Sequence, residues 1–212
     1  GGGGGAPARP RPLVVILRGI PGAGKSYLTS RLKAAAAKRR RRVVSCSADD
    51  FFLDQHGRYH FDQARIRDAH HSSFSKFSST LQRTPTAVLL VDNTNTQRWE
   101  YQNYLDHARR HHAEVHVVAV VCEGEAAMRA AAARNQHGVG LEAVTRMWKR
   151  WEHDPDSLVV PSSAASPATA SDSESAAPNP PPPMSGPSAS AVPAAAPAVV
   201  LSAHTPAWQG AG

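Results

Sequence analysis

The segment 18–26, RGIPGAGKS, contains the residue types that bind nucleotide phosphates, at a fixed spacing. It fits the phosphate-loop pattern G-x-x-x-x-G-K-[ST]. Glycines let backbone N–H groups approach a phosphate closely, Lys25 can supply a mobile charge to the β- and γ-phosphates, and the Ser26 hydroxyl can coordinate Mg²⁺. We expect the following residues to bind a nucleotide: Gly19, Pro21, Gly22, Ala23, Gly24, Lys25, Ser26 and Tyr27.

The surroundings of this motif decide between a phosphate loop and a glycine-rich turn with an exposed lysine. Residues 13–17 are an apolar run typical of a buried strand, and residues 27–37 have the pattern of a helix. A strand before the motif and a helix after it are the context that a phosphate loop requires, and the helix N-terminus adds its positive end. The sequence therefore predicts a phosphate loop.

Two further groups of polar residues follow apolar runs. SADDFF holds Asp49 and Asp50, and VDNTN holds Asp92, Asn93 and Asn95. Asp92 ends an apolar run as a Walker B acid does and would hold Mg²⁺. Asp49 is the candidate general base for an acceptor hydroxyl, although a helix-capping role or a role in Mg²⁺ binding stays open for it. We expect Asp50, Asn93 and Asn95 to contact substrate, or in the case of the asparagines to orient Mg²⁺-bound water.

Several basic residues are candidates for a lid over the phosphates. Arg134 opens the segment RNQHGVG, and an arginine there could stabilise the charge that develops during phosphoryl transfer. Arg146 and Arg150 share one helix face and either line the same cleft or form a solvated surface. Most histidines are expected to be surface or core residues, and His70 and His137 are expected near the site. Trp148 and Trp151 either pack in the core or stack on a base.

The elements that must position these residues form an alternating pattern. Apolar, β-branched runs occupy residues 13–17, 43–47, 87–91 and 115–121, and helical stretches occupy residues 26–37, about 61–81, 98–111, 125–134 and 141–151. Apolar runs without alternation, separated by helices, are typical of a parallel sheet covered on both faces. We predict a doubly wound α/β fold, a P-loop three-layer sandwich, whose ligands collect at the carboxyl ends of the strands.

Composition divides the chain into three parts. Residues 161–212 are rich in Ala, Pro and Ser and hold no Lys or Arg, which predicts a disordered tail, and residues 1–12 form a Gly- and Arg/Pro-rich arm. The folded domain is thus expected at residues 13–160, long enough for a hydrophobic core. Net charge is +7, and because the tail adds two acids and no bases, the rest carries +9. This excess fits a polyanionic partner such as nucleic acid or nucleotide.

The run Lys38 to Arg42 contributes much of this charge. It falls where the first helix should end, so it is either a solvated helix terminus favoured by the helix dipole or a patch for nucleic acid or targeting. Cys46 and Cys122 are far apart in the sequence, as expected for reduced thiols of an intracellular protein. No apolar run approaches the length of a membrane span, and because the chain begins with Gly1, organelle targeting stays open.

A family resemblance emerges from eight blocks taken together. RGIPGAGKS, SADDFF, HGRYHF, DAHH, LLVDNTN, RWEYQNY, RNQHGV and RMWKRWEHD resemble the NEDD-four-binding-protein-two-like proteins, a branch of the P-loop ATPases of polynucleotide-kinase type. The resemblance implies strand order 2-3-1-4, a mobile lid, Asp49 as catalytic acid, Lys25 and Ser26 at ATP, and Arg134 as lid arginine. Phe52 stands where those kinases carry an arginine for the acceptor, and Gly138 replaces a second lid arginine.

Two hypotheses follow. One is an enzyme that uses ATP and Mg²⁺ to move the γ-phosphate to a hydroxyl, on a nucleic acid 5′ end or a nucleotide-like small molecule. The other is an ATP-binding adaptor with little or no transferase activity. Asp49 discriminates between them, because a binding module needs Lys25 and Ser26 but no base.

Overall fold

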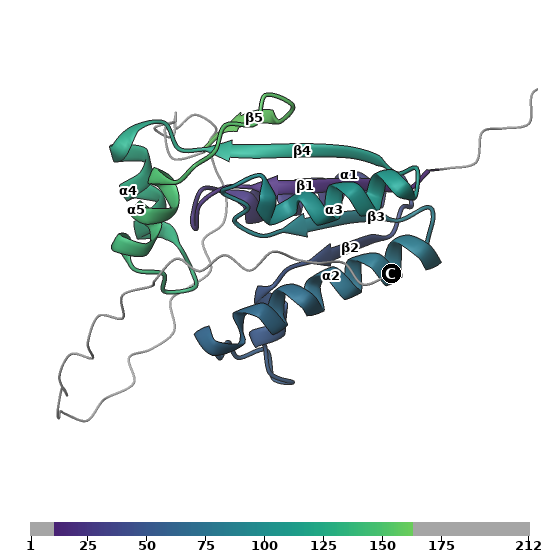
Figure 1. The fold of residues 1–212 in the computed structure, drawn as a ribbon, viewed down its shortest axis with the longest axis horizontal. Coiled ribbons are helices and arrows are strands. Elements are labelled where there is room, and N and C mark those ends of the chain that lie inside the picture. The colour runs from purple at the N-terminus through teal and green to yellow at the C-terminus, as the bar shows by residue number, and fades with distance from the viewer. Residues whose placement is uncertain (1–10, 163–212) are drawn as a thin grey trace, which may run out of the picture. The chain divides into compact units, whose positions relative to one another are not determined.

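Five parallel strands form the centre of the computed structural model, which describes residues 11–162 (Figure 1). The strands lie in the order β2-β3-β1-β4-β5, so the predicted parallel sheet and the order 2-3-1-4 are confirmed. Apart from residues 11–12 and 161–162, the predicted arm and tail lie outside the described residues. The strands are β1 (Leu13–Arg18), β2 (Val43–Cys46), β3 (Val88–Asp92), β4 (Glu114–Val121) and β5 (Leu158–Pro161).

Strand β1 lies at the centre of the sheet, and its apolar side chains are buried on both faces. Leu13 pairs with Val88 of β3 on one side and with Glu114 of β4 on the other. Val14, Ile16 and Leu17 are fully buried, as expected for a strand covered by helices on both faces. The register places the carboxyl ends of β1 and β3 together, with Leu17 opposite Asp92.

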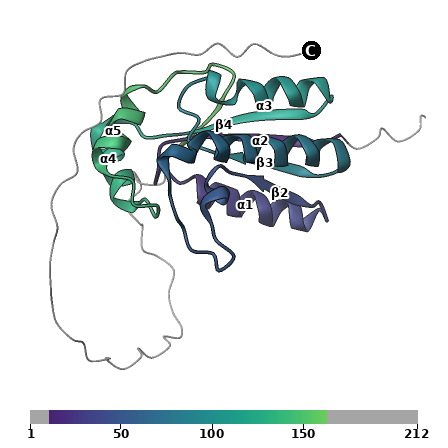
Figure 2. The ribbon, with the colours of Figure 1, turned by 60° about the horizontal axis from the view of Figure 1, so that its bottom comes forward.

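The helices cover the two faces unequally. Helix α1 packs on the face formed by Val15, Leu17 and Leu90, whereas α2 and α3 pack on the opposite face. Figure 2 shows α1 and α3 on opposite sides of the sheet. Figure 1 shows α4 and α5 beyond the sheet, at the end toward which the strand arrows point. The helices are α1 (Lys25–Lys38), α2 (Ile66–Arg83), α3 (Trp99–Arg110), α4 (Gly124–Arg134) and α5 (Leu141–Lys149).

The segment predicted as one helix from about residue 61 begins with a short 3₁₀ helix, and the α-helix starts later. Asp62 is extended and its side chain accepts a hydrogen bond from the Ala64 backbone N–H, which caps the short 3₁₀ helix η2 (Gln63–Arg65). Helix α2 therefore starts at Ile66. A second 3₁₀ helix, η1 (Asp49–Phe52), follows β2 and packs through Phe52 and Ala48 against Ala69 of α2.

Strand β5 was not predicted from the sequence pattern. It is short, Leu158 and Val159 are 58% exposed, and Pro161 ends it. After it, Ser162 donates its backbone N–H to the Val121 carbonyl and its hydroxyl to the Ala23 carbonyl. The end of β5 is thus fastened to the phosphate loop. Within residues 11–162, no helix is long and apolar enough to cross a membrane.

Candidate functional site

The loop between β1 and α1 has the backbone geometry that its glycines permit. Gly22 (φ 75°) and Gly24 (φ 116°) adopt a backbone region that L-residues with side chains rarely enter. Gly24 is also the N-cap of α1 and offers no side chain to cap the helix. The N–H groups of the first turn and the positive end of the helix dipole are therefore available to an anion.

Lys25 is the first residue of α1, and its side chain reaches back to this loop. Its Nζ donates to the carbonyl oxygens of Gly19 at 2.7 Å and Ile20 at 3.3 Å. Burial lowers the pKa of the Lys25 ammonium, and the carboxylates of Asp92 and Asp49 oppose this shift by favouring its charge. The structure thus brings the predicted phosphate lysine close to both predicted acids, which come from two different strand ends.

Asp92 is oriented by a residue of α1. The Thr29 hydroxyl donates to Asp92 Oδ2 at 3.0 Å, and Thr29 lies one turn after Ser26. Ser26 is exposed at the start of the helix. A serine hydroxyl and a carboxylate are hard oxygen ligands, and Mg²⁺ in nucleotide sites completes its shell with phosphate and water. These two side chains fit the Mg²⁺ role predicted for them.

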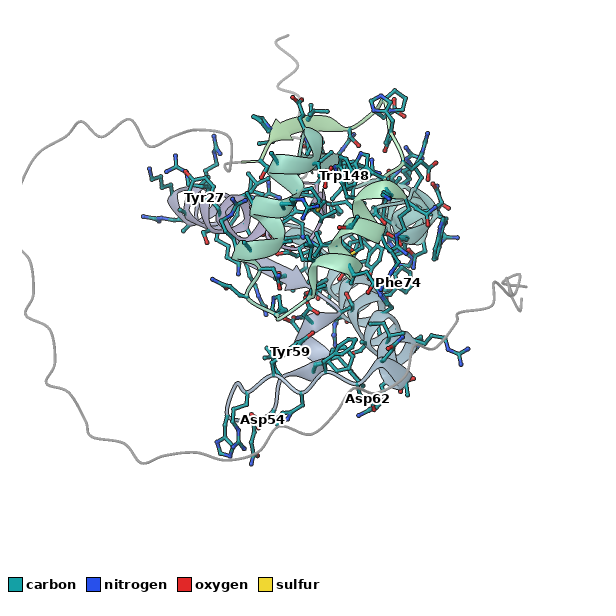
Figure 3. The ribbon with its side chains drawn as sticks, turned by 90° about the vertical axis from the view of Figure 1, so that its left-hand side faces the viewer. Tyr27, Asp54, Tyr59, Asp62, Phe74 and Trp148 are labelled. Carbon is teal, nitrogen blue, oxygen red and sulfur yellow. The ribbon has the colours of Figure 1, made fainter. Side chains whose placement is uncertain are left out.

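Asp49 lies in η1 with its carboxylate half exposed. The Tyr59 hydroxyl donates to Asp49 Oδ1 at 3.0 Å, and His137 Nε2 of the α4–α5 loop lies 4.0 Å from Oδ2. Burial, together with the Asp49 charge, raises the pKa of Tyr59 to about 12, so Tyr59 remains a donor at neutral pH. Figure 3 shows Tyr59 in the loop that carries Asp54 at its far end.

Two other residues of η1, Asp50 and Phe52, contact other parts of the protein. Asp50 Oδ2 accepts a hydrogen bond from Lys76 Nζ of α2 at 2.9 Å. Phe52 is 5% exposed and packs against Tyr59 and Phe61. The position at which the related kinases would carry an acceptor-binding arginine is therefore part of the core.

Asn93 and Asn95 hold the ends of strands. Asn93 Oδ1 accepts the Ala48 N–H at 2.9 Å, which fixes the start of η1, and Asn93 Nδ2 is buried with no hydrogen-bond partner within the described residues. Asn95 Nδ2 donates to the Leu17 carbonyl at 2.8 Å, and the backbone of Asn95 is left-handed (φ 46°). Their side chains therefore position the loops that carry Asp49 and Lys25.

Helix α4 lies directly against the phosphate loop. Arg134 Nη2 donates to the Gly22 carbonyl at 2.9 Å, so the predicted lid arginine reaches the loop. A Cβ at Gly22 would lie 1.9 Å from the Ala131 carbonyl oxygen, which shows how closely the two backbones approach. Gly22 is needed for this contact as well as for its φ value.

The two arginines of the last helix lie apart from this contact. Arg146 pairs with Glu142 on the surface of α5. Arg150 donates to Thr96 Oγ1 at 2.9 Å and to Glu100 Oε1 at 3.2 Å, and so ties the end of α5 to the start of α3. The structure does not bring either guanidinium to Asp49 or Lys25 by a described contact.

The aromatic residues of the last helix line a cavity near the phosphate loop. Trp148 donates to the Cys122 carbonyl at 3.1 Å and packs between α4 and α5, as Figure 3 shows. The cavity has a volume of about 250 Å³ and is lined by Ile20, Val120, Val121, Cys122, Trp148 and Trp151. Trp148 is thus both a packing residue and part of a cavity wall.

Arg18 is a positioning residue that sequence reasoning missed. It is fully buried, and its guanidinium donates to the carbonyl oxygens of Asn95, Thr96 and Glu152. Its Cζ lies 4.6 Å from the centre of the Trp151 ring. The signal was an arginine that ends an otherwise apolar strand, directly before the phosphate loop. Because the Arg18 contacts join segments up to 139 residues apart, only the structure identifies its partners.

Comparisons with known proteins extend this picture. A family model described as "AAA domain" (AAA_33) matches residues 14–154. Human NEDD4-binding protein 2 is 29% identical over 152 residues, which cover 72% of this chain and 8% of that protein. Human YLP motif-containing protein 1 is 24% identical over 175 residues, covering 73% of this chain and 8% of that protein. The chain thus spans less than a tenth of the length of these human relatives.

Solved structures share the fold at low sequence identity. One is the Pnkp1/Rnl/Hen1 RNA repair complex, with a TM-score of 0.52 and 17% identity, covering 68% of this chain and 45% of that chain. A second is the Mycobacterium tuberculosis APS kinase CysC with AMPPNP and APS, with a TM-score of 0.51 and 13% identity, covering 73% and 90% of the two chains. The fold is that of P-loop kinases. With the family match over residues 14–154, the chain belongs to the AAA domain family of P-loop proteins.

Proposed function

We propose that this protein is an ATP- and Mg²⁺-dependent phosphotransferase that moves the γ-phosphate of ATP to a hydroxyl. The observation that carries the proposal is the convergence of two carboxylates on the phosphate-loop lysine. The sheet register sets Asp92 opposite Leu17, at the end of the strand that leads into the phosphate loop. The hydrogen bond from the Ala48 N–H to Asn93 Oδ1 holds the start of η1, which carries Asp49, beside the end of the same strand as Asp92. A protein that only binds nucleotide needs the lysine and a metal-binding acid. The second carboxylate has the chemistry of a base.

Each side chain has a role in the proposed reaction. The acceptor oxygen forms a bond to the γ-phosphorus while the bond between that phosphorus and the bridging oxygen breaks, and ADP leaves. Asp49 accepts the proton of the acceptor hydroxyl, and Tyr59 holds the carboxylate in place through its 3.0 Å hydrogen bond. Lys25 and Arg134 stabilise the negative charge that spreads over the phosphate oxygens.

Mg²⁺ would be held by Ser26 and Asp92, and when bound it neutralises charge on the β- and γ-phosphates. The Thr29 hydroxyl fixes the Asp92 carboxylate for this purpose. Arg134, which contacts the Gly22 carbonyl, lies where it can exchange that contact for a phosphate oxygen. The backbone N–H groups in the first turn of α1 would donate hydrogen bonds to the phosphates.

The acceptor is proposed to be a nucleic acid 5′ end or a nucleotide-like small molecule. Support for the first comes from the resemblance to polynucleotide kinases and from the RNA repair complex among the solved structures that share the fold. Against it, Phe52 is buried where an acceptor-binding arginine would stand. We propose that His137, whose half-exposed side chain lies 4.0 Å from Asp49 Oδ2, contacts the acceptor instead.

A transfer screen tests the proposal. Purified protein, Mg²⁺ and γ-labelled ATP would be incubated with 5′-hydroxyl DNA, 5′-hydroxyl RNA, nucleosides and small polyols. Label in at least one acceptor, lost in the Lys25→Ala variant, is the expected result. ATP binding without transfer to any acceptor would contradict it and would instead favour the ATP-binding adaptor.

A further inference from the structure

The end of the sheet opposite to the phosphate loop carries a dense group of unpaired positive charges. In a parallel sheet the connecting helices run back across it, so α1, α2 and α3 all end near the starts of the strands, as Figure 1 shows. Basic residues occupy each of these ends. We call them the basic face, which consists of Lys38, Arg39, Arg40, Arg42, Arg83, Arg109 and Arg110.

Hydrogen bonds between the segments keep these ends together. The Val88 N–H donates to the Arg42 carbonyl at 2.8 Å, and Arg41 Nε donates to the Thr86 carbonyl at 3.0 Å. These contacts join the end of α1 to the start of β3. The Glu114 N–H donates to the Pro12 carbonyl at 2.9 Å, which joins the start of β4, four residues after the end of α3, to the start of β1. The basic face is thus one contiguous surface built from both layers of helices.

Within the described residues, carboxylates near the basic face form no ion pair with it. Asp106, one turn before Arg110 on α3, instead accepts a hydrogen bond from Gln102. All seven side chains are exposed, and within residues 11–162 none takes part in an ion pair. In the segments 38–43, 83–88 and 109–114, Glu114 is the one acidic residue, and it pairs with His116. Helix α1 itself contains no Asp or Glu.

Stabilisation of helix ends accounts for only part of this charge. A cation in the last turn of a helix gains about 0.3–1 kcal/mol from the dipole, which explains four of the seven residues: Lys38, Arg83, Arg109 and Arg110. Arg40 and Arg42 follow the end of α1 and lie outside its last turn. Seven like charges on one surface also repel each other, and a bound polyanion would relieve this repulsion.

The chemistry of the basic face fits the backbone of a nucleic acid. Six of its seven residues are arginines, whose planar donors match phosphate oxygens. The basic face extends across both layers of helices, and none of its residues lines either of two cavities of about 630 and 250 Å³ in the described residues. An open, extended surface suits an extended polyanion better than a small anion. The exposed large apolar side chains that a membrane anchor would need lie outside its three segments.

We propose that the basic face is a second binding site, which holds a nucleic acid strand by its phosphates at the end of the domain remote from Asp49. Its binding is sequence-independent and does not require ATP. The site holds whether or not the phosphotransfer proposed above occurs, because its residues and those around Lys25 lie at opposite ends of the sheet. The two proposals can therefore fail separately.

The test measures fluorescence anisotropy of a labelled single-stranded DNA of about 20 nucleotides bearing a 5′-phosphate, which leaves no 5′-hydroxyl acceptor. The full chain with Arg39→Glu and Arg110→Glu should bind it at least about tenfold more weakly than the parent, with a shallower salt dependence. The double variant Arg39→Ala with Arg110→Ala should lose DNA affinity by a smaller factor. Melting temperatures verify that both double variants are folded. Binding should be equal with and without ATP, as expected for a site remote from the phosphate loop.

The matched control is Arg67→Glu with Arg129→Glu, which changes net charge equally on exposed parts of α2 and α4. It should retain most of the affinity for DNA. Equal losses of DNA affinity in the two Arg→Glu double variants would overturn the proposal, since the attraction to DNA would then depend on net charge alone. So would a parent chain that fails to bind DNA, or that binds phosphatidylserine vesicles and not DNA.

Discussion

Arg134 and Gly22 are 112 residues apart in sequence, and the arginine Nη2 lies 2.9 Å from the glycine carbonyl oxygen. This contact joins helix α4 to the phosphate loop. It occurs where the two backbones are so close that a methyl group at Gly22 would meet the Ala131 carbonyl. The loop that would hold the phosphates and the helix that would close over them therefore form one packed unit.

Gly22→Ala should destabilise the protein by about 3 kcal/mol, because it adds a clash to the cost of a left-handed backbone. ATP affinity should fall with it. Gly138→Ala is the matched control, since Gly138 has φ 66° but a methyl group added there would meet no atom within 4 Å. Gly138→Ala should destabilise the protein by only about 1 kcal/mol, the cost of a left-handed backbone at an alanine. Equal losses in chemical denaturation would show that α4 does not press on the loop.

Lys25→Ala should weaken ATP binding by at least about 2 kcal/mol, or roughly thirtyfold, because a charge-assisted contact to the phosphates is lost. The exposed Lys33 of the same helix provides the control, and Lys33→Ala should bind ATP nearly as the parent does. Calorimetric titration measures both. Equal affinities of the Lys25 variant and the parent would exclude a phosphate-binding role for this loop.

Thr29→Val should raise the Mg²⁺ concentration needed for tight ATP binding several-fold, since it removes the hydrogen bond that orients Asp92. Binding of ATP without Mg²⁺ should change little. Thr80→Val removes a hydroxyl that bonds only to the Lys76 carbonyl in α2, and it should leave the Mg²⁺ dependence intact. Titrations over a series of Mg²⁺ concentrations compare the two variants.

His107 should make stability fall as the solution becomes acidic. Burial between α2 and α3, assisted by His111 and Arg110, lowers the pKa of His107 from 6.5. The folded state thus binds fewer protons than the unfolded state, and stability present above about pH 6.5 is lost as pH falls below it. The melting temperature of the parent should drop more steeply between pH 8 and about pH 5.5 than that of His107→Gln. His112→Gln, at an exposed position, should follow the parent, and a parallel drop in all three would contradict this assignment.

The sheet and the phosphate loop could be predicted because their signals are local. An apolar run, a glycine pattern and a helical run in succession determine β1, the loop and α1, and the structure has them within one residue of the predicted bounds. Strand β5 could not be predicted, since three of its four residues are exposed and the last of them is a proline. It forms by pairing with β4, a contact that a sequence window does not contain.

The candidate site also combines features that local sequence signals predict with contacts between distant segments that they do not. The positions of Lys25, Asp49 and Asp92 at neighbouring strand ends follow from the topology rule for parallel sheets. The contact of Tyr59 with Asp49 depends on a loop held by Asp54, whose carboxylate accepts backbone bonds from His56 and Arg58. No periodic pattern marks such a loop, so the residue that orients the proposed base was missed.

Asp49 is proposed to be a base and not a structural acid, and its amide variant tests this role. Asp49→Asn keeps the shape of the side chain but cannot accept the hydroxyl proton, whereas Asp106→Asn changes a carboxylate on the surface of α3 and is the control. The decisive measurement is the rate of γ-phosphate transfer, taken beside ATP affinity at fixed Mg²⁺, with the acceptor that the screen identifies. We expect a rate about 10²–10⁴-fold lower for Asp49→Asn, with ATP affinity nearly unchanged and the control at the parent rate. A variant that keeps most of its rate, or loses rate only in step with ATP affinity, would contradict the assignment of Asp49 as the base.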